Sequence, residues 1–250
     1  MTPSRVVVTG LRKRFGRLEA LRGLDFAIEP GRVTAVAGPN AAGKTTLIKT
    51  ILGLVRPDRN GRGGGGGIEV DGVVVNGGPE YRRRIGYMPQ AACFPEHLTG
   101  REVIRLLTAL RGRPPAGGAA LDTELIGRFR LDATLDRPVR TLSGGTRQKL
   151  NAVAAFLFRP SLLILDEPTA GLDPVAAGIL KDKVRRAPAE GTTVLLTSHI
   201  MSEIEELADD LVFLVEGRVA YRGTVQALIA ASGQPRLEPA IARLLQEAGA

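Results

Sequence analysis

Cysteine is almost absent from this sequence, since Cys93 is the single cysteine among 250 residues. One cysteine cannot form a disulfide within the chain, and it cannot supply the paired ligands of a cysteine metal cluster. We expect it to be buried or half-buried, as small hydrophobic residues usually are. A chain of this length can bury a core of its own, and it suits one domain or one domain with an inserted lobe.

Long hydrophobic runs are missing too, although 44% of the residues are hydrophobic and 24% are charged, as in ordinary globular proteins. No run approaches the roughly 20 residues that span a bilayer, and the N-terminus lacks the pattern of a signal peptide. We therefore expect a cytoplasmic protein. Any role at a membrane would then need a separate spanning partner.

Acidic residues are in the minority. The 34 Lys and Arg residues exceed the 26 Asp and Glu residues, and the net charge is +8. This balance suits polyphosphate, anionic lipid headgroups or nucleic acid. The basic residues are scattered, and only Arg82-Arg83-Arg84 forms a run, which we interpret as a solvated face. Charge alone therefore does not identify the partner.

Short apolar runs rich in β-branched residues recur along the chain, as expected of strands buried between two layers. Such strands are predicted at 33–37, 162–165, 194–197 and 211–215, and helices at 43–53, 175–186 and 201–208. This alternation predicts an α/β fold with a mostly parallel sheet. The segments 6–9, 24–29 and 68–75 instead resemble strands of an antiparallel side sheet.

Between residues 90 and 159 the strand signals stop, and helices are expected at 101–110, 123–130 and 145–158. We interpret this region as an α-helical subdomain inserted into a core made of residues 1–89 and 160–232. A short helical tail is expected at 233–250. The tract 59–67 has six glycines among nine residues, which predicts a loop.

One segment has the pattern of a phosphate-binding loop. It reads Gly38-Pro39-Asn40-Ala41-Ala42-Gly43-Lys44-Thr45, followed by Thr46, and it lies between an apolar strand and a helix. Its glycines allow backbone N–H groups to surround the β- and γ-phosphates of a nucleotide at the positive end of the helix. Lys44 would add a positive charge there, and Thr45 would offer a hydroxyl to Mg²⁺.

An acidic pair, Asp166-Glu167, ends the apolar run at 162–165. Asp166 is placed to hold Mg²⁺ through water, and Glu167 would polarise the attacking water as a general base. Two acids that open a loop mean little in isolation. Beside a phosphate-binding loop they indicate nucleotide hydrolysis.

A third motif, Leu142-Ser143-Gly144-Gly145-Thr146, stands between the other two. Together the three motifs resemble those of the ATP-binding-cassette ATPase family, and the likeness covers residues 6–224. This resemblance implies a P-loop, RecA-like core. Thr146 stands where glutamine is commoner in that family, and Phe15 stands where tyrosine is commoner.

The resemblance implies roles for three further residues near the nucleotide. Phe15 would stack its ring on adenine, for which only the ring face is needed. Gln90 would contact Mg²⁺ and water at the boundary of the helical region. His199 would contact the γ-phosphate and hold Glu167 in place.

The resemblance also implies a second subunit. Ser143, Gly144 and Gly145 at the start of a helix would form an anion site for the ATP that another subunit holds. Asp173, in the loop 171–173, would couple the two sites across the dimer. Two copies of the chain, or one copy and a homologue, should therefore enclose two ATP molecules, and hydrolysis should reopen the dimer.

The resemblance further implies a transporter. A separate permease would dock beside Gln90, and it would hold the protein at the cytoplasmic face of the inner membrane. The segments 98–102 and 170–174 resemble the exporter-like branch, and 143–149 resembles subunits encoded near copper-dependent nitrous-oxide reductase. The sequence names neither the transported substrate nor the direction of transport.

Two other functions stay open. One is a soluble cassette ATPase that acts on DNA or the ribosome, but the interval from Lys44 to Leu142 has no sustained heptads or cysteine pairs, and the chain has only one cassette. No nucleic acid is therefore expected. The other is a nucleotide-sensing module without catalysis, which predicts that Glu167→Gln leaves turnover unchanged.

Overall fold

The computed structural model describes residues 5–58, 66–75, 78, 80–111 and 120–247. Most of the tract 59–67, which we predict to be a loop, lies outside the described residues, and its last residue, Gly67, begins a strand. Among the described helices, none combines the length and the hydropathy that a bilayer span requires.

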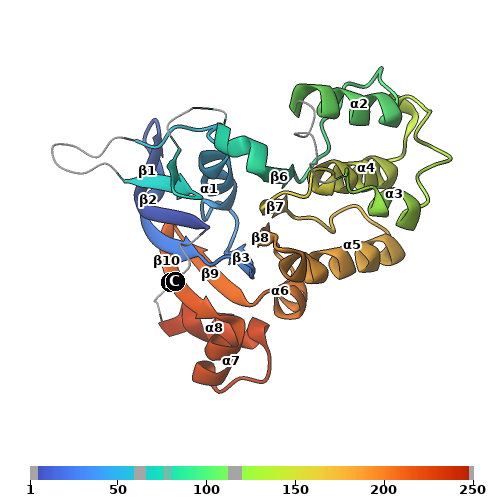
Figure 1. Cartoon of the computed structure of the whole chain (residues 1–250). Helices are drawn as coiled ribbons and strands as arrows, with labels where there is room; N and C mark the ends of the chain where they lie inside the picture. The colour runs from blue at the N-terminus through green and yellow to red at the C-terminus, as the bar shows by residue number, and fades with distance from the viewer. Residues whose placement is uncertain (1–4, 59–65, 76–77, 79, 112–119, 248–250) are drawn as a thin grey trace.

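A six-stranded sheet forms the centre of the molecule, in the order β10-β9-β3-β8-β7-β6 (Figure 1). Its strands are β3 (Val33–Ala37), β6 (Ile85–Met88), β7 (Leu162–Asp166), β8 (Thr193–Thr197), β9 (Asp210–Val215) and β10 (Arg218–Thr224). All neighbouring strands are parallel except β9 and β10. Every residue of β3, β7 and β8 is buried, which explains why these runs are apolar. The predicted mostly parallel α/β core is confirmed.

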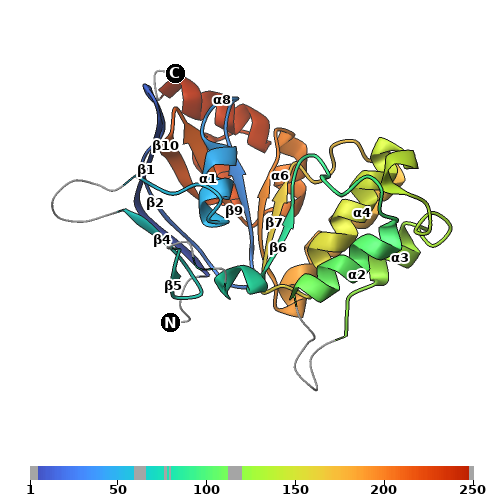
Figure 2. The same ribbon diagram turned by 90° about the horizontal axis from the view of Figure 1, so that it is seen from above.

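Helices follow several strands of this sheet: α1 (Lys44–Ile51) follows β3, α5 (Pro174–Arg186) follows β7, α6 (Met201–Leu207) follows β8 and α7 (Val225–Ser232) follows β10. The helix α8 (Leu237–Glu247) comes after α7, and the 3-10 helices are η1 (Glu80–Arg84), η2 (Val139–Thr141) and η3 (Ala187–Glu190). In Figures 1 and 2, α8 lies close to β10. Leu237, Ala240 and Ile241 of α8 are buried in the main core, so the expected C-terminal tail packs onto the rest of the chain.

A second, antiparallel sheet has the order β2-β1-β4-β5. Its strands are β1 (Val6–Phe15), β2 (Leu18–Ile28), β4 (Gly67–Val70) and β5 (Val73–Val74). The segment 68–75, which we expected in an antiparallel side sheet, belongs to this sheet and forms a hairpin of β4 and β5. Its turn residues Asp71 and Gly72 have φ angles of 51° and 73°, as in the Asp-Gly turns that match the twist of paired strands.

Three helices lie together on the side of the central sheet away from β1 and β2 (Figure 2). They are α2 (Gly100–Arg111), α3 (Glu124–Arg128) and α4 (Gly144–Phe156). The helix α4 packs closely on the edge strand β6, since a Cβ on Gly86 would stand 2.1 Å from the carbonyl oxygen of Ala155. These helices fall within the region 90–159, whose limits as a subdomain remain a proposal.

Cys93 lies in the segment between β6 and α2, and it is exposed. Our expectation of a buried or half-buried cysteine is therefore wrong. Hydrophobic character favours burial, but this connection runs over the surface, where loops normally lie because water satisfies their backbone groups.

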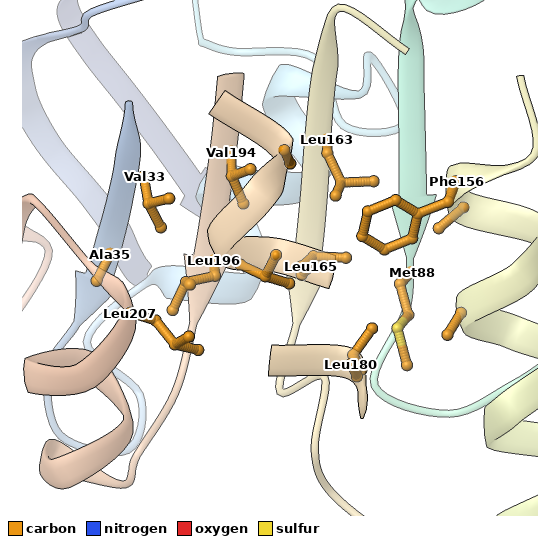
Figure 3. Close-up of a cluster of buried hydrophobic side chains, with 14 of the residues drawn as sticks. Val33, Ala35, Met88, Phe156, Leu163, Leu165, Leu180, Val194, Leu196 and Leu207 are labelled. Atoms are coloured by element: carbon orange, nitrogen blue, oxygen red, sulfur yellow. The ribbon is translucent and has the colours of Figure 1, made fainter. Parts of the chain in front are cut away.

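Two hydrophobic clusters form the core, one on each face of the central sheet. Figure 3 shows the first, to which α4, β7 and α5 contribute Phe156, Leu163 and Leu180. The second fills the space between the central sheet, α1 and the antiparallel sheet. Successive residues of β3 alternate between them, because side chains of a strand point to opposite faces: Ala35 joins the first cluster and Val36 the second.

Lys183 on α5 is only 2% exposed, which is rare for a lysine. Its Nζ lies 2.8 Å from a carboxylate oxygen of Asp122, 2.9 Å from Glu124 and 3.3 Å from Glu190. Burial by itself would lower the pKa of Lys183, but the hydrogen bonds from its ammonium to Asp122 and Glu124 raise it above the ordinary value. This ammonium joins α5 to the segment that leads into α3 and to η3.

We predict that Lys183→Met lowers the free energy of unfolding by about 3 kcal/mol, because it leaves the buried carboxylate of Asp122 without its counter-ion. Urea denaturation would measure this loss. Arg101→Met is the matched control, since the Arg101–Asp136 pair at 2.7 Å is exposed to solvent and should contribute much less to the free energy of unfolding. Equal losses in the two variants would contradict the prediction.

Candidate functional site

A pocket of about 530 Å³ opens at the carboxyl ends of β3, β7 and β8. Ligands of parallel α/β sheets bind at this edge, where the loops after the strands meet. Its lining comprises Leu18, Ala20, Asn40, Ala41, Ala42, Gly43, Lys44, Thr45, Thr46, Gln90, Asp166, Glu167 and His199. The structure thus brings together the phosphate-binding loop, Gln90, the acidic pair and His199, which lie far apart along the chain.

Two positions in the loop from β3 to α1 require glycine. Gly38 and Gly43 have φ angles of 148° and 103°, and a Cβ at these positions would stand 2.1 Å from the Leu214 carbonyl oxygen and 2.7 Å from that of Ala20. Any side chain would therefore clash with neighbouring backbone. The loop presents a bare backbone cradle, which suits the phosphates of a nucleotide.

Lys44 lies across this cradle. Its Nζ donates hydrogen bonds to the carbonyl oxygens of Gly38, at 2.6 Å, and Pro39, at 3.0 Å. Burial lowers the pKa of Lys44, and the nearby Glu167 and Asp166 carboxylates oppose that shift. A partly desolvated ammonium at the rim of a backbone cradle is well placed to bind a polyphosphate.

Asp166 and Glu167 stand at the end of β7, where a hydroxyl from β8 holds them. Thr197 Oγ1 donates to Asp166 Oδ1 at 2.6 Å and accepts from the backbone N–H of Glu167 at 3.1 Å. Asp166 is buried, and Glu167 has a φ of 51°, a left-handed conformation that turns the chain sharply out of the strand. Thr197 is a site residue that the sequence patterns do not reveal.

His199 contacts Glu167. Its Nδ1 lies 2.7 Å from Glu167 Oε2, and its backbone N–H donates to the same oxygen at 3.3 Å. The imidazole is largely exposed while the carboxylate is mostly buried, with 67% and 12% of their side-chain surfaces accessible. The carboxylate is therefore fixed, and the ring reaches into the open part of the pocket.

Gln90 borders the pocket from the side of the helices. Its carbonyl oxygen accepts from Gln148 Nε2 at 3.4 Å, and the preceding Pro89 carbonyl accepts from Asn151 Nδ2 at 2.8 Å. Gln148 and Asn151 are buried on α4 and contact each other at 3.3 Å. The backbone of this segment is thus tied to the helix that begins at the third motif.

Phe15 does not line the pocket. It ends β1, the residue is 47% exposed, and Lys13 Nζ lies 5.2 Å from the ring centroid. Its stacking on adenine stays a prediction. Leu18 and Ala20 of β2 line the pocket instead, although no local pattern in the sequence marks them.

The third motif lies outside this pocket. Ser143 caps α4, where its Oγ accepts the Thr146 N–H at 3.1 Å. A Cβ on Gly145 would stand 3.2 Å from the Gly171 carbonyl oxygen, and Lys149 Nζ donates to Asp173 Oδ2 at 2.8 Å. The start of α4 and the loop before α5 therefore form one surface, separate from the phosphate-binding loop of the same chain.

The donor sets of the pocket fit a nucleotide with a hard cation. The cradle and Lys44 match phosphate oxygens, whereas Thr45, Gln90 and Asp166 present oxygen atoms, which Mg²⁺ prefers. A carboxylate held by a histidine stands next to them. This arrangement can bind a nucleoside triphosphate and activate a water molecule beside its γ-phosphate.

Comparison with known proteins agrees with a pocket that binds a nucleoside triphosphate. The sequence pattern of the ABC transporter family matches residues 21–170. The chain is 40% identical to the daunorubicin resistance ATP-binding protein DrrA3 of Streptomyces coeruleorubidus over 250 residues, which cover 100% of this chain and 76% of that protein. It is 35% identical to the Nod factor export ATP-binding protein I of Ralstonia nicotianae, covering 89% and 68% of the two chains.

Solved structures agree with this result. The ATP-binding subunit of an ABC transporter superimposes with a TM-score of 0.87 at 33% identity, covering 96% of this chain and 99% of that one. A dimeric, post-hydrolysis ATP-binding cassette bound to ADP and Pi has the same fold, with a TM-score of 0.74, 21% identity and coverage of 88% and 98%. These likenesses favour a transporter subunit over a soluble cassette ATPase that acts on DNA or the ribosome. The chain belongs to the ABC transporter family, as an ATP-binding and ATP-hydrolysing subunit.

Proposed function

We propose that this chain supplies the ATP-driven step of an exporter, as a homodimer at the cytoplasmic face of a membrane beneath a separate permease. The observation that carries the proposal is a pocket that gathers Lys44, Asp166, Glu167 and His199, while Ser143 lies elsewhere. The names of relatives, for daunorubicin resistance and Nod factor export, support export. The narrower resemblance of 143–149 to subunits encoded near nitrous-oxide reductase stays a prediction.

Hydrolysis follows from the placement of Glu167. Water adds to the γ-phosphorus, the bond to the bridging oxygen of ADP breaks, and Glu167 accepts the proton of the water. His199 holds this carboxylate through the 2.7 Å contact. Thr45, Gln90 and Asp166 would hold Mg²⁺, which neutralises charge on the β- and γ-phosphates when bound.

A dimer would complete each site. The N-terminus of α4 combines Ser143 with two glycines that expose backbone N–H groups, and the 13-residue helix adds its positive end. These groups do not line the pocket of their own chain, so they are free to meet phosphates held by a second copy. In a two-fold dimer each chain would give its third motif to the partner and receive the partner's in return.

A groove beside Gln90 supports the permease as partner. Its volume is about 510 Å³, and its walls include Phe94, Leu107, Leu110 and Phe158 together with Arg82, Arg83 and Arg111. Arg111 stacks on Phe158 at 4.6 Å and donates to the Ile85 carbonyl, yet within the described residues it has no carboxylate partner. An amphipathic segment with apolar and acidic side chains fits such walls.

The basic run Arg82-Arg83-Arg84 is only partly the solvated face that we expected. Arg83 and Arg84 are exposed, but Arg82 is half-buried and reaches the Gly53 carbonyl at 3.4 Å. The guanidinium of Arg82 thus belongs to the wall of the groove and not to bulk solvent.

Glu167→Gln should lower ATP turnover by about 100-fold or more, because an amide cannot accept the proton of the attacking water. Phosphate release would measure turnover, and gel filtration with ATP should show an accumulated dimer. Glu216→Gln, an exposed acid at 78% side-chain accessibility, is the matched control and should keep normal turnover. Unchanged turnover in Glu167→Gln would favour a nucleotide-sensing module.

Mixed dimers would test whether the site is shared. Ser143→Arg blocks only the third motif, and Glu167→Gln inactivates only the pocket, so a dimer with one subunit of each kind keeps one intact site. Differently tagged copies purified in tandem should regain about half of the normal turnover, although each variant alone is inactive. Pairing Lys44→Ala with Glu167→Gln should restore nothing, since each chain then lacks a functional pocket. Equal recovery in both mixtures would contradict the shared arrangement.

Substitutions in the groove would test whether a permease binds there. We expect an integral membrane protein to purify with the tagged chain from solubilised membranes, and Leu110→Glu to reduce its recovery by about tenfold, because a charge enters the apolar groove. Leu54→Glu is the control, since Leu54 is a similarly exposed leucine outside the groove, at 62% against 74% for Leu110. Isolation of a monodisperse chain free of membrane protein would overturn the proposal.

A further inference from the structure

Glu203 on α6 is a buried carboxylate that the proposed chemistry does not use. It is 8% exposed, and a charge at such depth is costly unless hydrogen bonds and a counter-ion compensate it. Oε2 accepts the hydroxyl of Thr169 at 2.9 Å and that of Ser198 at 3.2 Å. Oε1 lies 3.5 Å from Lys181 Nζ. Both oxygens of the carboxylate thus have polar partners, and these partners come from three separate segments.

The two hydroxyls belong to the two loops that carry Glu167 and His199. Thr169 lies in the loop that leads from Glu167 toward Asp173, and its carbonyl accepts the Leu172 N–H at 3.1 Å. Ser198 directly precedes His199, and its Oγ also accepts the Ile200 N–H at 3.0 Å. Glu203 therefore joins the segments on both sides of the contact between Glu167 and His199.

The same connection extends to the third motif. The loop that starts at Glu167 ends at Asp173, which accepts a hydrogen bond from Lys149 on α4 and caps α5 by accepting the Ala176 N–H at 2.8 Å. A shift of this loop, when a partner binds at the surface of α4, would pull on Thr169. Through Glu203 the shift reaches Ser198 and the neighbouring His199.

We infer that Glu203 is a positioning residue, which holds the loop 167–173 to the segment 198–200 so that His199 keeps its contact with Glu167 during hydrolysis. The inference rests on the proposed ATPase chemistry and adds a residue to it. Glu203 is not among the residues that line the pocket, so it would act through Thr169 and Ser198. Its loss should lower the rate of the chemical step while the affinity for ATP, which depends on the cradle and Lys44, is retained.

Thr169 offers the cleanest test, because Thr169→Val keeps the shape of the side chain and removes only the hydroxyl. We expect kcat to fall by about tenfold, KM for ATP to change less than twofold, and the melting temperature to stay near that of the unchanged chain. Thr169→Ser returns the hydroxyl and should restore kcat. A merely structural contact would not give this combination of a kcat effect with rescue by serine.

Two further variants keep the test decisive. Ser198→Ala removes the other hydroxyl and should lower kcat in the same way. Glu206→Gln is the matched control, because Glu206 also lies on α6 and binds Lys181 at 2.9 Å but touches neither loop, so normal kcat is expected. Normal kcat in both Thr169→Val and Ser198→Ala, or an equal loss in Glu206→Gln, would overturn the inference. If the unchanged chain hydrolyses no ATP, the proposed function itself fails, and the two failures are thereby distinguished.

Discussion

Three neighbouring parallel strands, β3, β8 and β7, end at one edge of the central sheet, and the site depends on that alignment. Val36, Thr197 and Asp166 form one row across these strands. Because carboxyl ends of parallel strands meet at the same edge, the loops that follow them must open into one space. The phosphate-binding loop, the acidic pair and His199 converge for this reason.

Burial explains why the alignment is rigid. All residues of the three strands are buried, with one hydrophobic cluster on each face of the sheet. A strand therefore cannot shift its pairing register without exposing apolar side chains. Thr197 adds a polar lock at the strand ends, since a single hydroxyl binds the side chain of Asp166 and the backbone of Glu167. Glu167, the proposed general base, and Asp166, the predicted magnesium ligand, are thus positioned from one neighbouring strand.

The pocket and the third motif, which we propose to be the two half-sites of a shared ATP site, are built differently. The pocket uses bare backbone and a partly desolvated lysine, whereas the third motif uses a helix N-terminus beside Asp173. They lie apart in one subunit, and α4 connects them physically, since Ser143 caps its start and its buried Gln148 and Asn151 bind the backbone around Gln90. The loop from Glu167 to Asp173 makes a second connection. Events at one half-site therefore have two physical routes to the other.

The features that could be predicted from the sequence are those in which one short segment contains the whole pattern and also the physical reason for it. The pattern from Gly38 to Thr45 predicts the loop, and the short apolar runs rich in β-branched residues predict the parallel strands. The structure adds why the glycines are needed, since neither Gly38 nor Gly43 has room for a Cβ. Leu18 and Ala20, which line the pocket from another strand, carry no such pattern, and neither does Thr197. Cys93 is exposed although cysteine is usually buried, because residue hydrophobicity does not reveal that its segment crosses the surface.

The residue types alone indicate the chemistry: a cradle of glycines, a lysine, paired acids and a histidine, whose functional groups few other residues can replace. Which of these groups touch one another depends on the fold. The contact of His199 with Glu167, the engagement of Glu203 by two loops and the separation of Ser143 from the pocket all join residues distant along the chain. Such contacts arise from strand order and packing, which local patterns do not encode.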